Sequence, residues 1–222
     1  MSKLTPVVFV VDDDVSIRES VEALIETAGL RAKSFATAAE FLEACRDASP
    51  SCLVLDVSLP GLSGLDLQQR LGDQRDLPII FITGHGDIPM SVQAMKAGAI
   101  EFLTKPFNGE VLLSTIRRAI ESSSSAIGRE SELEQLRRGY GSLSPRERQV
   151  MAHVVAGRLN KQVGSELGIS EVTVKAHRGQ VMRKMNAASL ADLVRMAAAL
   201  DLPAAPVRGV PQTVAADKGT LA

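Results

Sequence analysis

Tryptophan is absent from this chain of 222 residues, tyrosine occurs once and cysteine occurs twice. Cys45 and Cys52 lack the spacing of metal ligands and fall in a predicted helix and a predicted strand, so we expect both to be reduced core residues. No apolar run approaches the roughly 20 residues that a transmembrane helix needs, and the N-terminus reaches three acids without a small-residue cleavage site. We therefore expect a cytoplasmic protein with no membrane partner.

Net charge is also small, −1 for the whole chain, but the charges are unevenly distributed. Residues 1–124 hold 11 Lys and Arg against 17 Asp and Glu, whereas residues 143–200 hold 9 against 4. Clustered acids favour a metal ion, and a basic domain favours nucleic acid. The distribution thus predicts an acidic N-terminal domain and a basic C-terminal domain with different ligands.

Short segments that we predict as strands recur through the first half of the chain, at residues 7–11, 31–35, 52–55, 79–83 and 100–104. Most of them lack the polar alternation of a half-exposed strand, as expected for parallel strands that are buried on both faces. A helical pattern follows each run. Five strands that alternate with five helices predict an α/β fold with a five-stranded, doubly wound parallel sheet.

Polar side chains follow four of these strands at their carboxyl ends, namely Asp12, Asp13, Asp56, Thr83 and Lys105. The carboxyl ends of a doubly wound sheet share one edge, where ligands bind, so we expect a single site. Carboxylates held together repel one another unless a cation lies among them, and Mg²⁺ prefers such oxygen ligands. Asp56 could then attack phosphorus as a nucleophile, while Lys105 and the Thr83 hydroxyl contact the phosphoryl oxygens.

Each of these residues also has a simpler interpretation. The acids at 12–14 could merely start a helix, whose dipole favours them, Thr83 could be an ordinary strand residue, and Lys105 could be a solvated surface lysine. His85 lies in a glycine-flanked loop with no evident partner, so we interpret it as a bystander and not as a catalytic base. The occurrence of all these side chains at successive strand ends favours one shared site.

A run of serines at residues 122–125 follows residue 121, where we expect the last helix of the α/β domain to end. The segment after the serines is charged, mostly helical in pattern and poor in apolar periodicity. The tail beyond Asp201 is rich in Ala, Pro and Val without any period. We therefore divide the chain into an α/β domain (1–124), a helical linker (125–142), a small all-α domain (143–203) and a disordered tail (204–222).

Within the all-α domain, a short helix capped by Asn160, a tight turn and a longer helix capped by Ser170 predict a helix-turn-helix. On the longer helix, one face should pack inward through Val174, His177, Val181 and Met185. The opposite face holds Val172, Lys175, Ala176, Gly179 and Arg183. Small residues there would let the backbone approach a major groove, and the cations would reach phosphates or base edges. A generic helical bundle with one charged side is the alternative.

Residues 7–121 resemble the receiver domain of two-component response regulators through the segments VVDDD, LDVSLPGLSG, ITGHGD and EFLTKPF. The resemblance implies that Asp56 is the phosphoacceptor and that Mg²⁺ is bound directly by Asp13, Asp56 and the Ser58 carbonyl and through water by Asp12. It also implies that Phe102 is an aromatic switch coupled to Thr83, and that the Lys105-Pro106 peptide is cis.

Residues 143–200 resemble the LuxR-type helix-turn-helix, and together with the segment GHGDIPMSVQAMKAG they place the chain closest to the FixJ branch of the FixJ/NarL response regulators. The resemblance implies that Lys161 and Arg178 contact the DNA backbone and that Lys175 and Ala176 enter the groove. Gly179 stands where some relatives have a base-reading lysine. The predicted DNA contacts are Lys161, Thr173, Lys175, Ala176, Arg178, Gly179 and Arg183. The helix capped by Ser189, with Leu190, Leu193, Val194 and Ala197, resembles the DNA-bound dimer contact.

The resemblance implies a transcription factor and not an enzyme. A sensor histidine kinase would phosphorylate Asp56, receivers would pair through the face between Ile88 and Phe107, and the homodimer would bind double-stranded promoter DNA and act on RNA polymerase. Two alternatives are a DNA-binding regulator that works without phosphorylation and an aspartyl-phosphate phosphohydrolase. Against the phosphohydrolase, the predicted site holds no general acid or base beyond His85.

Overall fold

The computed structural model describes residues 5–44, 49–72, 76–84 and 88–203. The chain divides into two compact units, residues 1–130 and residues 131–222, which we call the N-terminal and C-terminal units. Several predictions fall outside the described residues and are not tested: the core position of Cys45, the bystander role of His85 and the disorder of the tail at 204–222. No helix in the described ranges combines the length and the apolar run needed to cross a bilayer.

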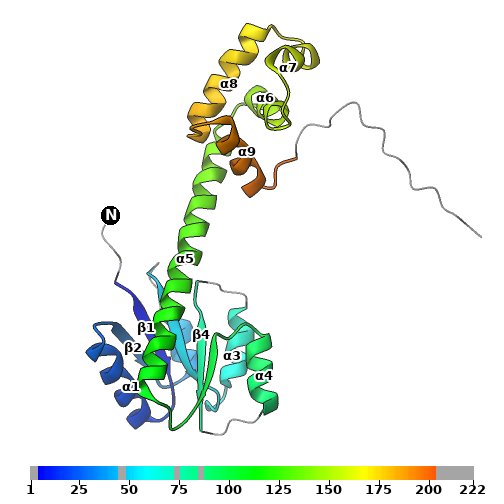
Figure 1. The fold of residues 1–222 in the computed structure, drawn as a ribbon. Helices are drawn as coiled ribbons and strands as arrows, with labels where there is room; N and C mark the ends of the chain where they lie inside the picture. The colour runs from blue at the N-terminus through cyan, green and yellow to red at the C-terminus, as the bar shows by residue number, and fades with distance from the viewer. Residues whose placement is uncertain (1–4, 45–48, 73–75, 85–87, 204–222) are drawn as a thin grey trace, which may run out of the picture. The chain divides into compact units, whose positions relative to one another are not determined.

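The N-terminal unit is built around one parallel sheet of five strands (Figure 1). Every neighbouring pair in it is parallel, and the strand order is β2-β1-β3-β4-β5. The order reverses direction after β2, so crossover helices must lie on both faces of the sheet. The predicted α/β fold is therefore confirmed, with strands β1 (Val7–Val11), β2 (Arg31–Phe35), β3 (Ser51–Asp56), β4 (Ile79–Thr83) and β5 (Glu101–Thr104).

Successive residues of the three central strands point into two different apolar cores. One core joins Phe9, Leu55 and Phe81 to helices α2 (Ala38–Glu43), α3 (Gly64–Leu71) and α4 (Ile88–Lys96). The other joins Val10, Val54 and Ile82 to helices α1 (Val15–Thr27) and α5 (Gly109–Gly141). Because both faces are covered, β1, β3 and β4 are buried along their whole length, which explains their continuous apolar runs.

Helix α5 is longer than the sequence pattern predicts. We expected it to end near residue 121, but it continues without a break through the serines to Gly141. Ser123 in this stretch is fully buried, and its hydroxyl is bonded to backbone groups of the sheet. The helix therefore continues past residue 121 with Ser123 anchored to the sheet, while Ser122, Ser124 and Ser125 are exposed.

The C-terminal unit contains four helices in its described residues beyond α5: α6 (Pro145–Val155), α7 (Asn160–Leu167), α8 (Glu171–Met185) and α9 (Leu190–Ala199). The side chains of Ser144, Ser170 and Ser189 cap α6, α8 and α9, and the caps at Ser170 and Ser189 were predicted. The predicted cap of α7 was wrong. Leu159 precedes that helix, and the Gln162 carboxamide accepts the Leu159 N–H at 2.8 Å, which leaves the Asn160 side chain for another partner.

Candidate functional site

Asp12 and Asp56 are neighbours because of the strand register. Val11 lies opposite Leu55 in the β1–β3 ladder, so the next residues along the two strands are these two aspartates. Both are buried, with exposed fractions of 0% for Asp12 and 5% for Asp56. Burial is the main reason that the pKa of Asp12 is raised above its ordinary value. The predicted gathering of acids at the carboxyl edge of the sheet is confirmed.

Lys105 joins the two aspartates across the sheet edge. Its Nζ donates to Asp12 Oδ2 at 2.6 Å and to Asp56 Oδ2 at 3.0 Å. The Lys105 N–H donates to the Thr83 carbonyl at 2.7 Å, and the cis peptide between Lys105 and Pro106 is present as expected. Burial alone would lower the pKa of Lys105, but the two carboxylates outweigh that effect and raise it.

A third acid, Asp13, completes a cluster of carboxylates that could hold a metal ion. One carboxylate oxygen from each of Asp12, Asp13 and Asp56 lies within 4.8 Å of the others. Three carboxylates and the single ammonium of Lys105 carry two net negative charges in a partly buried position, so another cation would lower their repulsion. The donors are all oxygens and Asp13 is exposed, which suits a hard ion such as Mg²⁺ that keeps several waters.

The loop after β3 folds back over Asp56. The Ser58 N–H donates to Asp56 Oδ1 at 3.2 Å, and the Gly64 N–H donates to the Val57 carbonyl at 3.0 Å. A Cβ on Gly64 would lie 2.2 Å from the Asp56 carbonyl oxygen, so only glycine fits there. This role of Gly64 was not predicted, since a glycine at a helix start carries no signal of which backbone approaches it.

The two predicted switch residues lie on the neighbouring strands. Thr83 ends β4 and has an exposed fraction of 0%. Phe102 lies opposite Phe81 in the β4–β5 ladder, with the two ring centroids 6.2 Å apart. Phe102 is partly buried against the core that includes α4. The Phe102 ring therefore lies in a partly buried position beside the strand that ends at Thr83.

Asp14 has the simpler role that the sequence analysis kept open for all three acids at 12–14. Its side chain caps α1 by accepting the Ser16 and Ile17 N–H groups. Arg18 from the same helix donates to the Asp12 carbonyl at 2.7 Å, an anchor that the sequence pattern did not reveal. The acid run is thus divided between a helix start and the acidic site.

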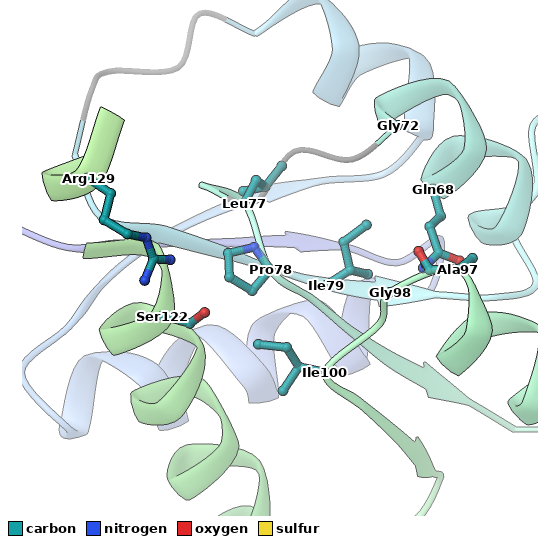
Figure 2. Close-up of a pocket in the computed structure, with 10 residues that line it drawn as sticks. All are labelled: Gln68, Gly72, Leu77, Pro78, Ile79, Ala97, Gly98, Ile100, Ser122 and Arg129. Atoms are coloured by element: carbon teal, nitrogen blue, oxygen red, sulfur yellow. The ribbon is translucent and has the colours of Figure 1, made fainter. Parts of the chain in front are cut away.

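A separate cavity lies at the opposite edge of the sheet, where β4 and β5 begin (Figure 2). It is lined by Pro78, Ile79 and Ile100 from the sheet segments and by Ser122 and Arg129 from α5. Among the described residues that line it, Arg129 is the only charged one. The described lining of this cavity therefore lacks the acids that gather at the carboxyl edge of the sheet, so the cavity is not the candidate phosphoryl site.

The exposed face of α8 in the C-terminal unit carries most of the predicted nucleic-acid contacts. Thr173, Lys175, Ala176, Gly179 and Arg183 are all exposed on it, and Lys161 is exposed at the start of α7. The other face packs into the core of the unit through Val174, Val181 and Met185. Helices α7 and α8 form the predicted helix-turn-helix. In the turn between them, Gly168 has a left-handed backbone conformation.

Comparisons with known proteins agree with both parts of this geometry. The family model described as the response regulator receiver domain matches residues 8–117, and the model for bacterial regulatory proteins of the luxR family matches residues 141–197. Nodulation protein W of Bradyrhizobium diazoefficiens is 49% identical over 199 residues, which are 89% of this chain and 88% of that protein. This chain belongs to the two-component response regulators with a LuxR-type DNA-binding domain.

Two further relatives place this response regulator within the FixJ branch. The transcriptional regulatory protein FixJ of the same Bradyrhizobium species is 42% identical over 191 residues, 86% of this chain and 93% of that protein. A solved structure of the response regulator StyR is 47% identical and has a TM-score of 0.79, covering 87% of this chain and 98% of that one. The response regulator is therefore a transcriptional regulator of a two-component system.

The structure adds three details to the sequence predictions for the DNA-binding part of the response regulator. His177 is half-buried and not fully packed inward. Arg178 is also half-buried, and its Nη1 donates to Asn160 Oδ1 at 3.3 Å, which joins α8 to α7. On α9, Leu193 and Ala197 are buried in the core of the unit, whereas Leu190 and Val194 are exposed.

Proposed function

We propose that Asp56 is the phosphoacceptor and that a cognate sensor histidine kinase is the phosphoryl donor. The observation that carries this proposal is the single ammonium of Lys105 shared by Asp12 and Asp56 at the carboxyl edge of the sheet. An Asp56 carboxylate oxygen forms the new bond to phosphorus while the bond from phosphorus to the donor imidazole nitrogen breaks, and the released imidazole takes up a proton. Lys105 lies where it can bind a phosphoryl oxygen.

Mg²⁺ is the proposed cofactor, held directly by Asp13, Asp56 and the Ser58 carbonyl and through water by Asp12. The all-oxygen donor set and its excess negative charge support this choice. Mg²⁺ supplies positive charge that neutralises the phosphoryl oxygens. Asp12, which is buried, orients Lys105 through the 2.6 Å bond to its ammonium.

Thr83 and Phe102 are the proposed switch. After phosphorylation of Asp56, the Thr83 hydroxyl shifts and donates to a phosphoryl oxygen. The Phe102 ring then takes the space that the Thr83 side chain has left. Support comes from the full burial of Thr83 and from the partly buried position of Phe102 beside Phe81. A switch of this kind works only if the phosphoryl group binds one of two arrangements more tightly.

Phosphorylation then promotes homodimerisation through the face between Ile88 and Phe107, where Ile88, Val92 and Met95 of α4 are exposed apolar residues. The homodimer binds double-stranded promoter DNA and acts on RNA polymerase. The proposed DNA contacts are Lys161, Thr173, Lys175, Ala176, Arg178, Gly179 and Arg183. Of these, Arg178 reaches a phosphate from the position in which Asn160 holds it.

We assign these roles to a receiver domain at 1–124 and a DNA-binding domain at 143–203, joined by a helical linker at 125–142 and followed by a tail at 204–222. The protein acts in the cytoplasm and has no catalytic turnover of its own on free substrates. The continuous helix α5 across the linker agrees with a helical connection.

The test is the intact mass of the full chain after incubation with acetyl phosphate and Mg²⁺, beside a chelated sample and the Asp56→Asn variant. We expect one hydroxylamine-labile phosphoryl group in the wild type and none in Asp56→Asn. Asp66→Asn is the matched control, because Asp66 is an exposed acid in the first turn of α3. Phosphoryl incorporation in Asp56→Asn would contradict the assignment, and unchanged promoter affinity after phosphorylation would favour a regulator that works without it.

A further inference from the structure

Three residues with little or no polar surface line the exposed face of α8. Val172, Ala176 and Gly179 are spaced by four and then three residues, so they lie along one side of the helix. All three are exposed, and the exposed fraction of Val172 is 79%. We call these three residues the apolar strip. Lys175 is exposed beside it, and Arg183 is exposed one turn beyond Gly179.

Gly179 in this strip is not required by the fold of the C-terminal unit. A Cβ built at this position meets no atom within 4 Å, and the residue does not have a positive φ. Glycine inside a helix is less favourable than alanine by roughly 0.5–1 kcal/mol. None of the described residues of the unit compensates for that cost, so the reason for a glycine lies in what approaches the helix from outside.

Val172 is placed where a helix-turn-helix reads bases. The second helix of such a motif enters the major groove and contacts base edges with its N-terminal residues, and Val172 is the second residue of α8. The major groove presents one apolar group on base edges, the C5-methyl of thymine, and small apolar side chains recognise it. The two methyl groups of Val172 match that target, whereas they satisfy no donor or acceptor.

We propose that the apolar strip reads thymine, with Val172 against a thymine C5-methyl group, Ala176 beside it, and Gly179 allowing the DNA to approach the helix closely. This inference rests on the proposed function of α8 as the DNA-reading helix and adds a base to it. Val172 thereby selects an A·T pair at one position of each half-site. Lys175 and Arg183 hold the helix in the groove through phosphates or neighbouring base edges.

The experiment uses the full chain with acetyl phosphate and Mg²⁺, and a DNA duplex that this protein selects from a library of random sequence. Each thymine of the selected duplex is replaced singly by deoxyuridine, which removes only the C5-methyl group. We expect one thymine position in each half-site to be sensitive to this change. Replacement at that position should weaken binding about fourfold, the loss expected for one buried methyl group. Val172→Ala should weaken binding to the unmodified duplex by a similar factor and should be insensitive to deoxyuridine at that same position.

Two further variants separate DNA contact from folding. Alanine has a higher helix propensity than valine or glycine, so neither Val172→Ala nor Gly179→Ala should lower the thermal midpoint of the C-terminal unit. Gly179→Ala should nevertheless weaken binding, because its methyl group occupies the space that the DNA needs. Val111→Ala on α5, another exposed valine, is the matched control and should bind like the wild type.

The outcomes distinguish this inference from the proposed function. If no duplex is selected, both are overturned. If a duplex is selected but no deoxyuridine replacement weakens wild-type binding, the DNA-binding function stands and thymine reading by the apolar strip is overturned. Equal sensitivity of the wild type and Val172→Ala to the same replacement would also overturn the role of Val172, since the methyl group would then be read by another residue.

Discussion

Replacing Ser123 with alanine removes the hydroxyl that links α5 to the beginning of β3. Ser123 Oγ accepts the Ser51 N–H at 2.9 Å and donates to the Asp76 carbonyl at 2.5 Å. In the β3–β4 ladder the Leu53 N–H donates to the Pro78 carbonyl, so the next bond of a regular parallel ladder would join the Ser51 N–H to the Asp76 carbonyl. The Ser123 hydroxyl therefore takes the place of one ladder bond.

The cost of this change is determined mainly by the Ser51 N–H. Ser51 is buried, whereas Asp76 is exposed and its carbonyl can bond to water instead. A buried donor left without an acceptor costs about 1–3 kcal/mol in the free energy of unfolding. Small domains have urea m values of about 1–3 kcal/mol per M, so we expect the urea midpoint of the N-terminal unit to fall by about 1 M.

Hydrogen exchange of the full chain in urea, read by mass spectrometry on peptides from each unit, separates the N-terminal transition from the C-terminal one. Ser125→Ala is the control: Ser125 is exposed, its hydroxyl donates only to the Glu121 carbonyl of the same helix, and alanine is the better helix former. An unchanged midpoint with a still-protected Ser51 amide in Ser123→Ala would refute the reasoning, because β3 and β4 would then have closed the ladder bond directly.

Two other changes test local features. Gly64→Ala should destabilise the N-terminal unit by several kcal/mol and abolish phosphoryl incorporation, because the new Cβ would lie 2.2 Å from the Asp56 carbonyl oxygen. Gly128→Ala is the control, since the space around Gly128 is open. It should leave the thermal midpoint and the phosphoryl incorporation measured by intact mass unchanged. The hydrogen bond from Lys184 lowers the pKa of Glu147, so that pair gives its full stabilisation of the C-terminal unit above the ordinary glutamate pKa and loses it as pH falls from there through the lowered pKa. Lys184→Met should therefore lower the urea midpoint at pH 7 more than at pH 3, and equal losses at both pH values would argue against an electrostatic origin.

The acidic site could be predicted in detail because its parts are encoded locally. A buried parallel strand has a recognisable apolar run, and the first polar residue after it lies at the carboxyl edge of the sheet whatever the rest of the chain does. Asp12, Asp56 and Lys105 were found in this way and lie together. The resemblance to receiver domains added the prediction of a switch role for Phe102, which its own sequence surroundings do not distinguish from a core residue.

The end of α5 and the cap of α7 were predicted wrongly for the same physical reason. A run of serines has a modest local tendency to end a helix, but tertiary packing overrides it when one serine is bonded to Ser51, 72 residues away. Asn160 is a good cap residue by local rules, yet its carboxamide accepts a bond from Arg178 on the next helix.

The sequence by itself determined the five strands, the helices between them, the order of the acidic and basic parts and the side chains at the strand ends, because periodicity, turn residues and helix caps act over a few neighbouring residues. Only the tertiary structure decided that Lys105 bridges two aspartates, that Gly64 must lack a side chain and that Ser123 completes the sheet. Each of these depends on which distant backbone or side chain approaches, and no local pattern records that approach.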